Sequence, residues 1–198
     1  MFQENISALT KLSAVLGAAL HERDAYTCLH GDRVMQVALA VGRSVGLNSQ
    51  ELGRLRAAAL LHDVGKIGIP DEVLLNPGAL DSAQLAIMRS HSERGEKILR
   101  AIPGEDANLV AEAVRHHHEE FDGSGYPDRL GGENIPVLSR IISITDNYDA
   151  MASRRVYHRP RDHEYIIGVM HEESGQKHDP YLLSKFMNVI ERSPLRVS

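Results

Sequence analysis

The sequence of 198 residues contains no tryptophan, three phenylalanines and one cysteine. A buried core must therefore consist mainly of Leu, Ile, Val, Ala and Met side chains. The single Cys28 excludes an intramolecular disulfide and suits a reducing compartment, so a cytoplasmic location is expected. No run of about 18 uncharged apolar residues is present, so no membrane span is predicted. Glu4 and Lys11 interrupt the N-terminal stretch, which is not typical of a signal peptide.

Excess positive charge is lacking as well. The formal net charge is −5 and the isoelectric point is near 6.1, which speaks against binding to duplex nucleic acid or to an anionic membrane surface. An anionic substrate would require a local cluster of positive charge. Histidine, in contrast, is abundant, and the eleven histidines suggest metal binding or acid–base chemistry.

Apolar residues recur at spacings of three and four along most of the chain, which predicts an all-α fold without strands. Ser49 is the expected N-cap of one helix, and Gly46 is expected to end the helix before it. Residues 1–22 should contain an N-terminal helix that pairs with a second copy or connects to another domain, and residues 23–198 should form one domain. The predicted helices are 5–22, 30–46, 49–62, 81–102 with a break near Gly95, 105–118, 136–153, 162–173 and 180–192.

Seven histidines and aspartates fall on helix faces that are otherwise apolar. A lone inward histidine is usually a core residue with one backbone partner, but buried charged groups must be paired or bound to metal. The nearby Arg33, Arg115 and Arg140 do not share these faces. Seven such groups together therefore favour a shared metal centre. They are His30, His62, Asp63, His91, His117, His118 and Asp146.

The ligand types narrow the choice of metal. Five imidazoles and two carboxylates without a thiolate suit iron, manganese, nickel or zinc better than calcium or magnesium. Seven ligands exceed the four of a structural zinc site, so two metals are predicted, with Asp63 as the bridge beside His62. The sequence contains neither a His-Glu-x-x-His motif nor the Glu-x-x-His pattern of ferritin-like di-iron proteins.

Three segments resemble the motifs of the HD-GYP phosphodiesterases. Residues 61–70 read Leu-His-Asp-Val-Gly-Lys-Ile-Gly-Ile-Pro, residues 88–91 read Met-Arg-Ser-His, and His117-His118-Glu119 precede Asp-Gly-Ser-Gly-Tyr-Pro at 122–127. Asp146 and Asp149 match the later acid-rich helix of that family. The resemblance implies an HD-domain helical bundle with a long GYP-containing loop. It also implies hydrolysis of cyclic di-GMP to pGpG and on to GMP.

The resemblance further implies how the ligands are shared. His30, His62, Asp63 and Asp146 would hold one metal, and His91, His117 and His118 would hold the other with Asp63 bridging. Two metals would lower the pKa of a bridging water enough for hydroxide to attack the phosphodiester at neutral pH. Iron or manganese is the expected cofactor, with nickel or zinc as alternatives.

Further residues are candidates for contacts with substrate or partners. Asp63 and Lys66 are predicted to be catalytic, with Lys66 on a phosphate oxygen and Gly65 leaving room for a ligand. Gly125, Tyr126 and Pro127 would shape the pocket mouth or receive a protein partner, since this loop is linked to partner binding in the family. The remaining candidates for substrate binding are Asp149, Arg155, Tyr157 and His158. Departures from the family pattern at Val156, His158 and His178 affect the expected substrate preference.

Several alternatives stay open. The substrate could be mixed cyclic GMP-AMP or pGpG, the domain could sense a nucleotide without cutting it, or an HD-type di-iron centre could activate oxygen. Tyr26 lies one turn before His30, where a carboxylate could help to bind a third metal, so its neutral phenol favours two. A diguanylate cyclase, a sensor domain or a second copy of the chain are the candidate protein partners.

Overall fold

The computed structural model describes residues 9, 12–13, 15–20, 22–23, 25–153 and 161–197, except for the side chains of residues 25–29. Within these residues no strand forms, and one isolated β-bridge joins Ser174 and His178, which confirms the all-α class. The named elements are α2 (Ala25–Ser44), α3 (Ser49–Leu61), the 3₁₀ helix η1 (Val64–Gly68), α4 (Asp71–Leu74), α5 (Ser82–Arg89), α6 (His91–Arg100), α7 (Glu105–Arg115), the 3₁₀ helix η2 (Gly132–Asn134), α8 (Val137–Ala152), α9 (His163–Glu172) and α10 (Pro180–Ile190).

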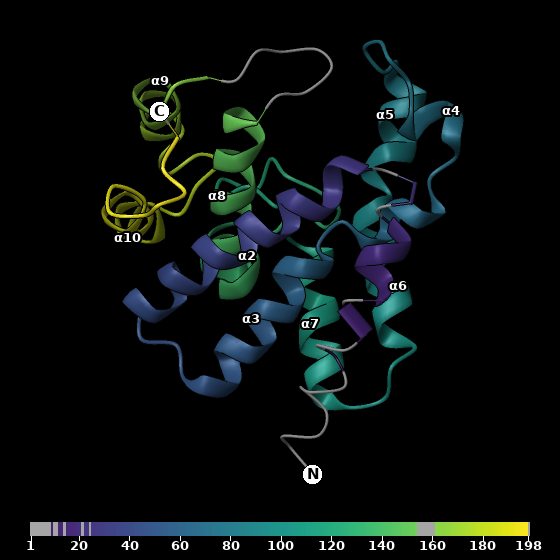
Figure 1. Cartoon of the computed structure of the whole chain (residues 1–198), viewed down its shortest axis with the longest axis horizontal. Coiled ribbons are helices and arrows are strands. Elements are labelled where there is room, and N and C mark those ends of the chain that lie inside the picture. The colour runs from purple at the N-terminus through teal and green to yellow at the C-terminus, as the bar shows by residue number, and fades with distance from the viewer. Residues whose placement is uncertain are drawn as a thin grey trace.

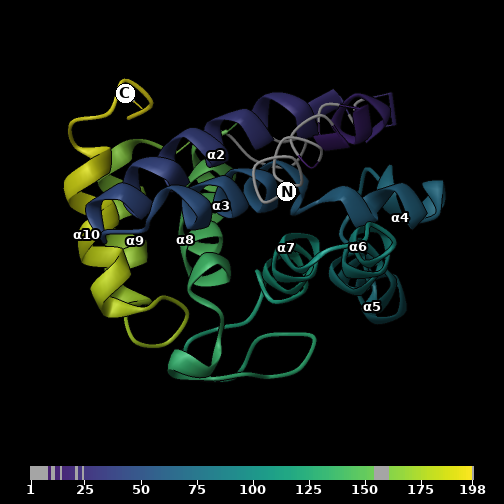
Figure 2. The same ribbon diagram turned by 90° about the horizontal axis from the view of Figure 1, so that it is seen from below.

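The helices form a bundle around α2. Helix α2 packs against α3, α8 and α10, and α7 packs against α3 and α6 (Figure 1). In the turned view, α2 and α3 form one layer above α7 and α6 (Figure 2). Helices α9 and α10 lie at one end of the molecule, and α4 and α5 lie at the other. The segment between α7 and α8 runs along the side opposite α2 (Figure 2).

The core is aliphatic, as the composition predicts. Leu55, Val110 and Ile141 are fully buried, and Phe186 is the largest fully buried side chain. Leu9 belongs to the same buried cluster, so at least this N-terminal residue packs on the bundle. Among the described helices, none combines the length and the apolar character that a membrane span requires.

Several helix boundaries differ from the prediction: α2 begins at Ala25 rather than at residue 30, and α7 ends at Arg115 rather than at residue 118. The N-cap of α3 is Asn48 rather than Ser49, because the Asn48 side chain accepts from two backbone amides and Glu51 completes a capping box. The break predicted near Gly95 lies instead at Ser90, between α5 and α6. There the Ser90 hydroxyl donates to the Ile87 carbonyl at 2.6 Å, and the Ser90 amide donates to the carbonyls of Ala86 and Ile87.

Candidate metal centre

The structure brings the seven predicted metal ligands together from five helical segments. They come from α2, the end of α3, the start of α6, the turn after α7, and α8. Two groups have ligand atoms within 4.8 Å of one another: His91, His117 and His118 form the first, and His30, His62 and Asp63 form the second. We call these the distal and the proximal group, respectively.

Asp63 lies between the two groups. Its Oδ2 atom is 3.5 Å from His62 Nε2 in the proximal group, and its Oδ1 atom is 3.6 Å from His91 Nε2 in the distal group. Asp146 joins the proximal side, with Oδ1 at 3.0 Å from His30 Nε2 and 3.9 Å from His62 Nε2. Each oxygen of Asp63 therefore faces one group, which is the arrangement that a bridging carboxylate needs.

For three of the five histidines, the local backbone selects the ring nitrogen that faces the centre. The Nδ1 atoms of His62, His91 and His117 donate to the carbonyls of Ala59, Met88 and Val114 at 2.8, 2.8 and 2.6 Å. In every case the carbonyl lies three residues earlier, in the last turn of a helix. With the proton fixed on Nδ1, the neutral ring offers its Nε2 lone pair to the centre.

The arrangement of these lone pairs fits a cation. His91 Nε2 and His117 Nε2 face each other at 3.3 Å, although both rings use Nδ1 as the donor. The buried Nε2 of His62 has no hydrogen-bond partner among the described residues. Two facing acceptors and one unsatisfied buried nitrogen are costly without a positive charge between them. The donor set of imidazoles and carboxylates suits a transition metal.

The charge states of His117 and His118 agree with a ligand role, whereas His30 is held in the charged form by two carboxylates. Burial, together with the neighbouring His118, holds the pKa of His117 well below its usual value, and burial together with His91 lowers the pKa of His118 to about 3. Neutral imidazoles are the form that binds metal. Burial lowers the pKa of His30, but the carboxylates of Asp146 and Asp149 outweigh it and raise that pKa to about 10.

Lys66 stands beside the bridging position. Its Nζ atom is 2.7 Å from Asp63 Oδ2, and this cation helps to hold the pKa of Asp63 low against the opposing effect of burial. The expectation that Gly65 leaves room for a ligand is wrong. A Cβ atom at position 65 would lie 1.8 Å from the His91 carbonyl oxygen, because η1 packs directly on the start of α6. Gly65 leaves room for protein backbone.

Asp149, a predicted substrate contact, lies directly behind a predicted ligand. Its Oδ2 atom accepts from His30 Nδ1 at 2.7 Å, and Arg33 donates to both carboxylate oxygens at 2.6 and 2.8 Å. Arg33 was not expected to share the helix faces that carry the predicted ligands, but its guanidinium donates to this carboxylate. One signal in the sequence could have indicated this pair. Arg33 lies three residues after His30 on α2, and Asp149 lies three residues after Asp146 on α8, so both lie one turn beyond a predicted ligand.

The Gly125-Tyr126-Pro127 segment is attached to the distal group. The Tyr126 ring stacks on the His118 ring with a centroid separation of 4.8 Å, and the Tyr126 amide donates to the His118 carbonyl at 3.1 Å. The Arg89 guanidinium lies over the Tyr126 ring at 5.1 Å. A Cβ atom at Gly125 would lie 2.2 Å from the Glu120 amide nitrogen, so this turn excludes a side chain.

Other predicted residues lie outside the described part of the chain. Arg155, Tyr157 and His158 fall in the segment 154–160, and so does Val156. The side chains of Tyr26 and Cys28 also fall outside the described set. Their predicted roles, including the preference for two metals over three, stay predictions.

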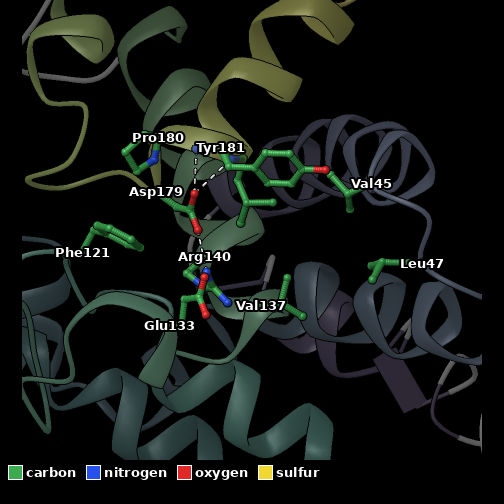
Figure 3. Close-up of a pocket in the computed structure, with 10 residues that line it drawn as sticks. Val45, Leu47, Phe121, Glu133, Val137, Arg140, Asp179, Pro180 and Tyr181 are labelled. Atoms are coloured by element: carbon green, nitrogen blue, oxygen red, sulfur yellow. Dashed lines mark hydrogen bonds and ion pairs between the residues drawn. The ribbon is translucent and has the colours of Figure 1, made fainter.

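A separate pocket of about 570 Å³ lies between the turn that follows α2, the start of α8 and the start of α10 (Figure 3). The ion pair of Arg140 and Asp179 crosses it, with Phe121 and Tyr181 at its sides. None of the seven predicted ligands lines this pocket. It is therefore distinct from the histidine-rich centre.

A third cluster of metal-binding residue types holds the segment before α8 in place. His116, Glu119 and Asp128 offer ligand atoms within 4.8 Å of one another. However, Asp128 pairs with Arg115 through both of its oxygens, and Glu119 accepts from two backbone amides. These acids already have strong partners, so we interpret the cluster as a structural clamp.

Comparison with known proteins places this arrangement in context. The HD-domain family matches residues 8–182. A cyclic di-GMP phosphodiesterase of Thermotoga maritima is 34% identical over 188 residues, which cover 95% of this chain and 51% of that protein. A 3′3′-cGAMP-specific phosphodiesterase of Vibrio cholerae is 37% identical over 168 residues, which cover 85% of this chain and 32% of that protein. The chain thus spans about half the length of the first of these relatives and a third of the second.

The fold agrees with a solved structure as well. The crystal structure of a cyclic GMP-AMP-specific phosphodiesterase of Vibrio cholerae superimposes with a TM-score of 0.69 at 22% identity. The match covers 93% of this chain and 49% of that chain.

Proposed function

Because the chain belongs to the HD-domain family and is of its HD-GYP type, we propose that it is a metal-dependent phosphodiesterase that hydrolyses cyclic di-GMP to pGpG and on to GMP. The observation that carries this proposal is the placement of Asp63, whose two oxygens each face one histidine group. The names of the relatives support phosphodiester chemistry on a cyclic dinucleotide.

The cofactors would be two divalent transition metals. His30, His62, Asp63 and Asp146 would hold the first, and the distal group would hold the second together with Asp63. When bound, such metals act as Lewis acids and make water nucleophilic at neutral pH. Iron or manganese is the proposed pair, and nickel or zinc would also suit these ligands.

The remaining task of the chain is to bind and orient the substrate. Lys66 would donate to a phosphate oxygen and offset the negative charge that develops there, since its ammonium lies next to the bridging carboxylate. Its ion pair with Asp63 keeps the ammonium at the edge of the centre. Arg155, Tyr157 and His158 remain candidates for guanine or phosphate contacts.

The alternative substrate is mixed cyclic GMP-AMP or pGpG. A relative with the cyclic GMP-AMP name is about as similar to this chain as the cyclic di-GMP enzyme. The Gly125-Tyr126-Pro127 segment is the proposed site for a diguanylate cyclase or sensor-domain partner. A second copy of the chain and a cytoplasmic location also remain predictions.

The test combines metal analysis with product analysis. Protein purified without oxygen should hold two metals per chain and convert cyclic di-GMP to pGpG and then GMP, with or without oxygen. Asp63→Asn should lower the content of both metals, whereas His91→Ala should mainly lower one. Parallel assays with mixed cyclic GMP-AMP and pGpG would rank the substrates.

Three outcomes would contradict the proposal in different ways. A folded protein that binds fewer than two metals, even after addition of iron or manganese, would refute the two-metal centre. Nucleotide binding without any product would favour a sensing module. Products that form only with oxygen would favour an oxygen-activating centre.

A further inference from the structure

We propose that Asp149, held in place by Arg33, is a positioning residue that sets the metal affinity of the proximal group through His30, a role that rests on the proposed metal centre. Asp149 touches no reacting atom in this role. It fixes the proton of His30 on Nδ1 and directs His30 Nε2 toward the centre, where Asp146 Oδ1 lies 3.0 Å away.

His30 is held differently from three other histidines of the centre. His62, His91 and His117 donate to main-chain carbonyls. His30 instead donates to a carboxylate, at 2.7 Å. A carboxylate is a stronger acceptor than a peptide carbonyl and makes the opposite ring nitrogen a better electron donor. The metal affinity of the proximal group should therefore depend on a side chain that substitution can remove.

Arg33 fixes the carboxylate in the orientation that His30 requires. Arg33 Nε lies 2.6 Å from Asp149 Oδ1, and Arg33 Nη2 lies 2.8 Å from Asp149 Oδ2, so the pair is bidentate. The Ser153 hydroxyl accepts from Arg33 Nη2 at 2.9 Å and lies 3.2 Å from Asp149 Oδ2. Because the guanidinium balances the charge of buried Asp149, this third carboxylate can lie near Asp63 and Asp146.

The effect of substitution should be confined to one metal. Asp149→Asn keeps an oxygen that can accept from His30. It removes the negative charge and one of the two oxygens that accept from Arg33. Loss of such a partner typically lowers metal affinity about 10- to 100-fold. Arg33→Lys keeps a positive charge without the two-point geometry, so its effect should be smaller and in the same direction. The hydrogen bonds described for Asp149 and Arg33 join them to each other, to His30 and to Ser153, so the distal group should keep its affinity.

The chain offers a matched control. Asp106 on α7 is a buried aspartate whose Oδ1 atom accepts from Arg54 Nε on α3 at 2.7 Å, in a pair that touches no predicted ligand. Asp106→Asn also removes a buried carboxylate from an arginine. It should therefore reproduce any general loss of stability without a selective effect on metal binding.

The experiment is a titration of metal-free protein with Mn²⁺ in competition with a chelator, supported by thermal unfolding of each variant. The wild type should bind two ions. Asp149→Asn should weaken one binding step about 10- to 100-fold and change the other less than about threefold. Arg33→Lys should weaken the same step, and Asp106→Asn should leave both steps unchanged.

The outcomes separate the two proposals. If the wild type binds fewer than two ions, the proposed metal centre fails. If the wild type binds two ions and both Asp149→Asn and Arg33→Lys match it, the role of Asp149 is refuted. Equal weakening of both steps in these variants, with the same pattern in Asp106→Asn, would also refute it. If Asp149→Asn does not fold, Arg33→Lys alone decides.

Discussion

Gly65 provides a severe test of the packing that joins the two ligand groups. In Gly65→Ala, the new Cβ atom would lie 1.8 Å from the His91 carbonyl oxygen and 2.5 Å from the Gly95 amide nitrogen. Carbon and oxygen atoms normally approach no closer than about 3.3 Å. The backbones of η1 and α6 must therefore separate by about 1.5 Å, and no side-chain rotation can relieve the contact.

Separation of the η1 and α6 backbones should lower both the stability of the fold and the metal affinity of the distal group. Overpacking of this kind costs about 1–3 kcal/mol, and a clash with backbone should lie at the upper end. For a chain of this length, about 3 kcal/mol corresponds to a melting temperature about 6–12 °C lower. Separation of η1 and α6 should move His91 Nε2 and Asp63 Oδ1 apart, whichever backbone shifts, from their present 3.6 Å. Mn²⁺ binding by the distal group should weaken.

The assay is thermal unfolding of the metal-free protein followed by Mn²⁺ titration. Gly31→Ala is the matched control, because Gly31 adjoins His30 but its added Cβ would lie 3.8 Å from the nearest neighbour outside its helix turn, the Leu60 carbonyl oxygen. That substitution should be neutral or stabilise α2 by up to about 1 kcal/mol. The reasoning is refuted if Gly65→Ala melts within about 2 °C of the wild type and binds both ions normally.

Three further predictions address single side chains. Lys66→Ala should lower kcat/KM about 10²- to 10³-fold while metal content stays unchanged, and full activity at limiting substrate would contradict its phosphate contact. Tyr126→Ala should lower metal occupancy in the distal group by freeing the His118 ring, whereas Tyr126→Phe should preserve it; equal occupancy in both would show that the stack is unimportant. Burial, with a smaller contribution from Lys177, lowers the pKa of His178 to about 4, although Glu173 Oε2 lies 3.3 Å from His178 Nε2 and favours the charged form. The unfolded chain therefore binds a proton near pH 6.5 that the folded chain does not bind. The free energy of unfolding should therefore fall by about 2 kcal/mol from pH 7.5 to pH 5 on account of this residue. Urea unfolding of His178→Gln should lack this part of the decrease, and an identical pH dependence would disprove it.

The convergence of the seven candidate ligands could be predicted from the sequence because buried polar groups break an apolar helical pattern. His30 and Asp146 stand in such a register, and the structure brings them to 3.0 Å. Helix α8 was also predictable, since Pro136 precedes a clear apolar repeat. Each of these predictions used the spacing of side chains along a single helix, which the helical period fixes.

The features that escaped prediction depend on contacts between segments. Gly65 packs against the His91 backbone, 26 residues later, and nothing in its local sequence shows that neighbour. The partner of Asp149 lies on another helix, so its carboxylate looked available for substrate. The break lies at Ser90, between α5 and α6, whereas the glycine at position 95 was the more visible signal in the local sequence.

The histidines that donate to main-chain carbonyls connect the centre to the rest of the fold. His62, His91 and His117 each close the last turn of a helix, so a cation that fixes these rings also fixes the ends of α3, α5 and α7. Helix ends fray through local opening, which hydrogen–deuterium exchange detects at individual amides. Metal loading should therefore slow amide exchange together at three helix ends that are far apart in the sequence, and this exchange reports whether metal is bound.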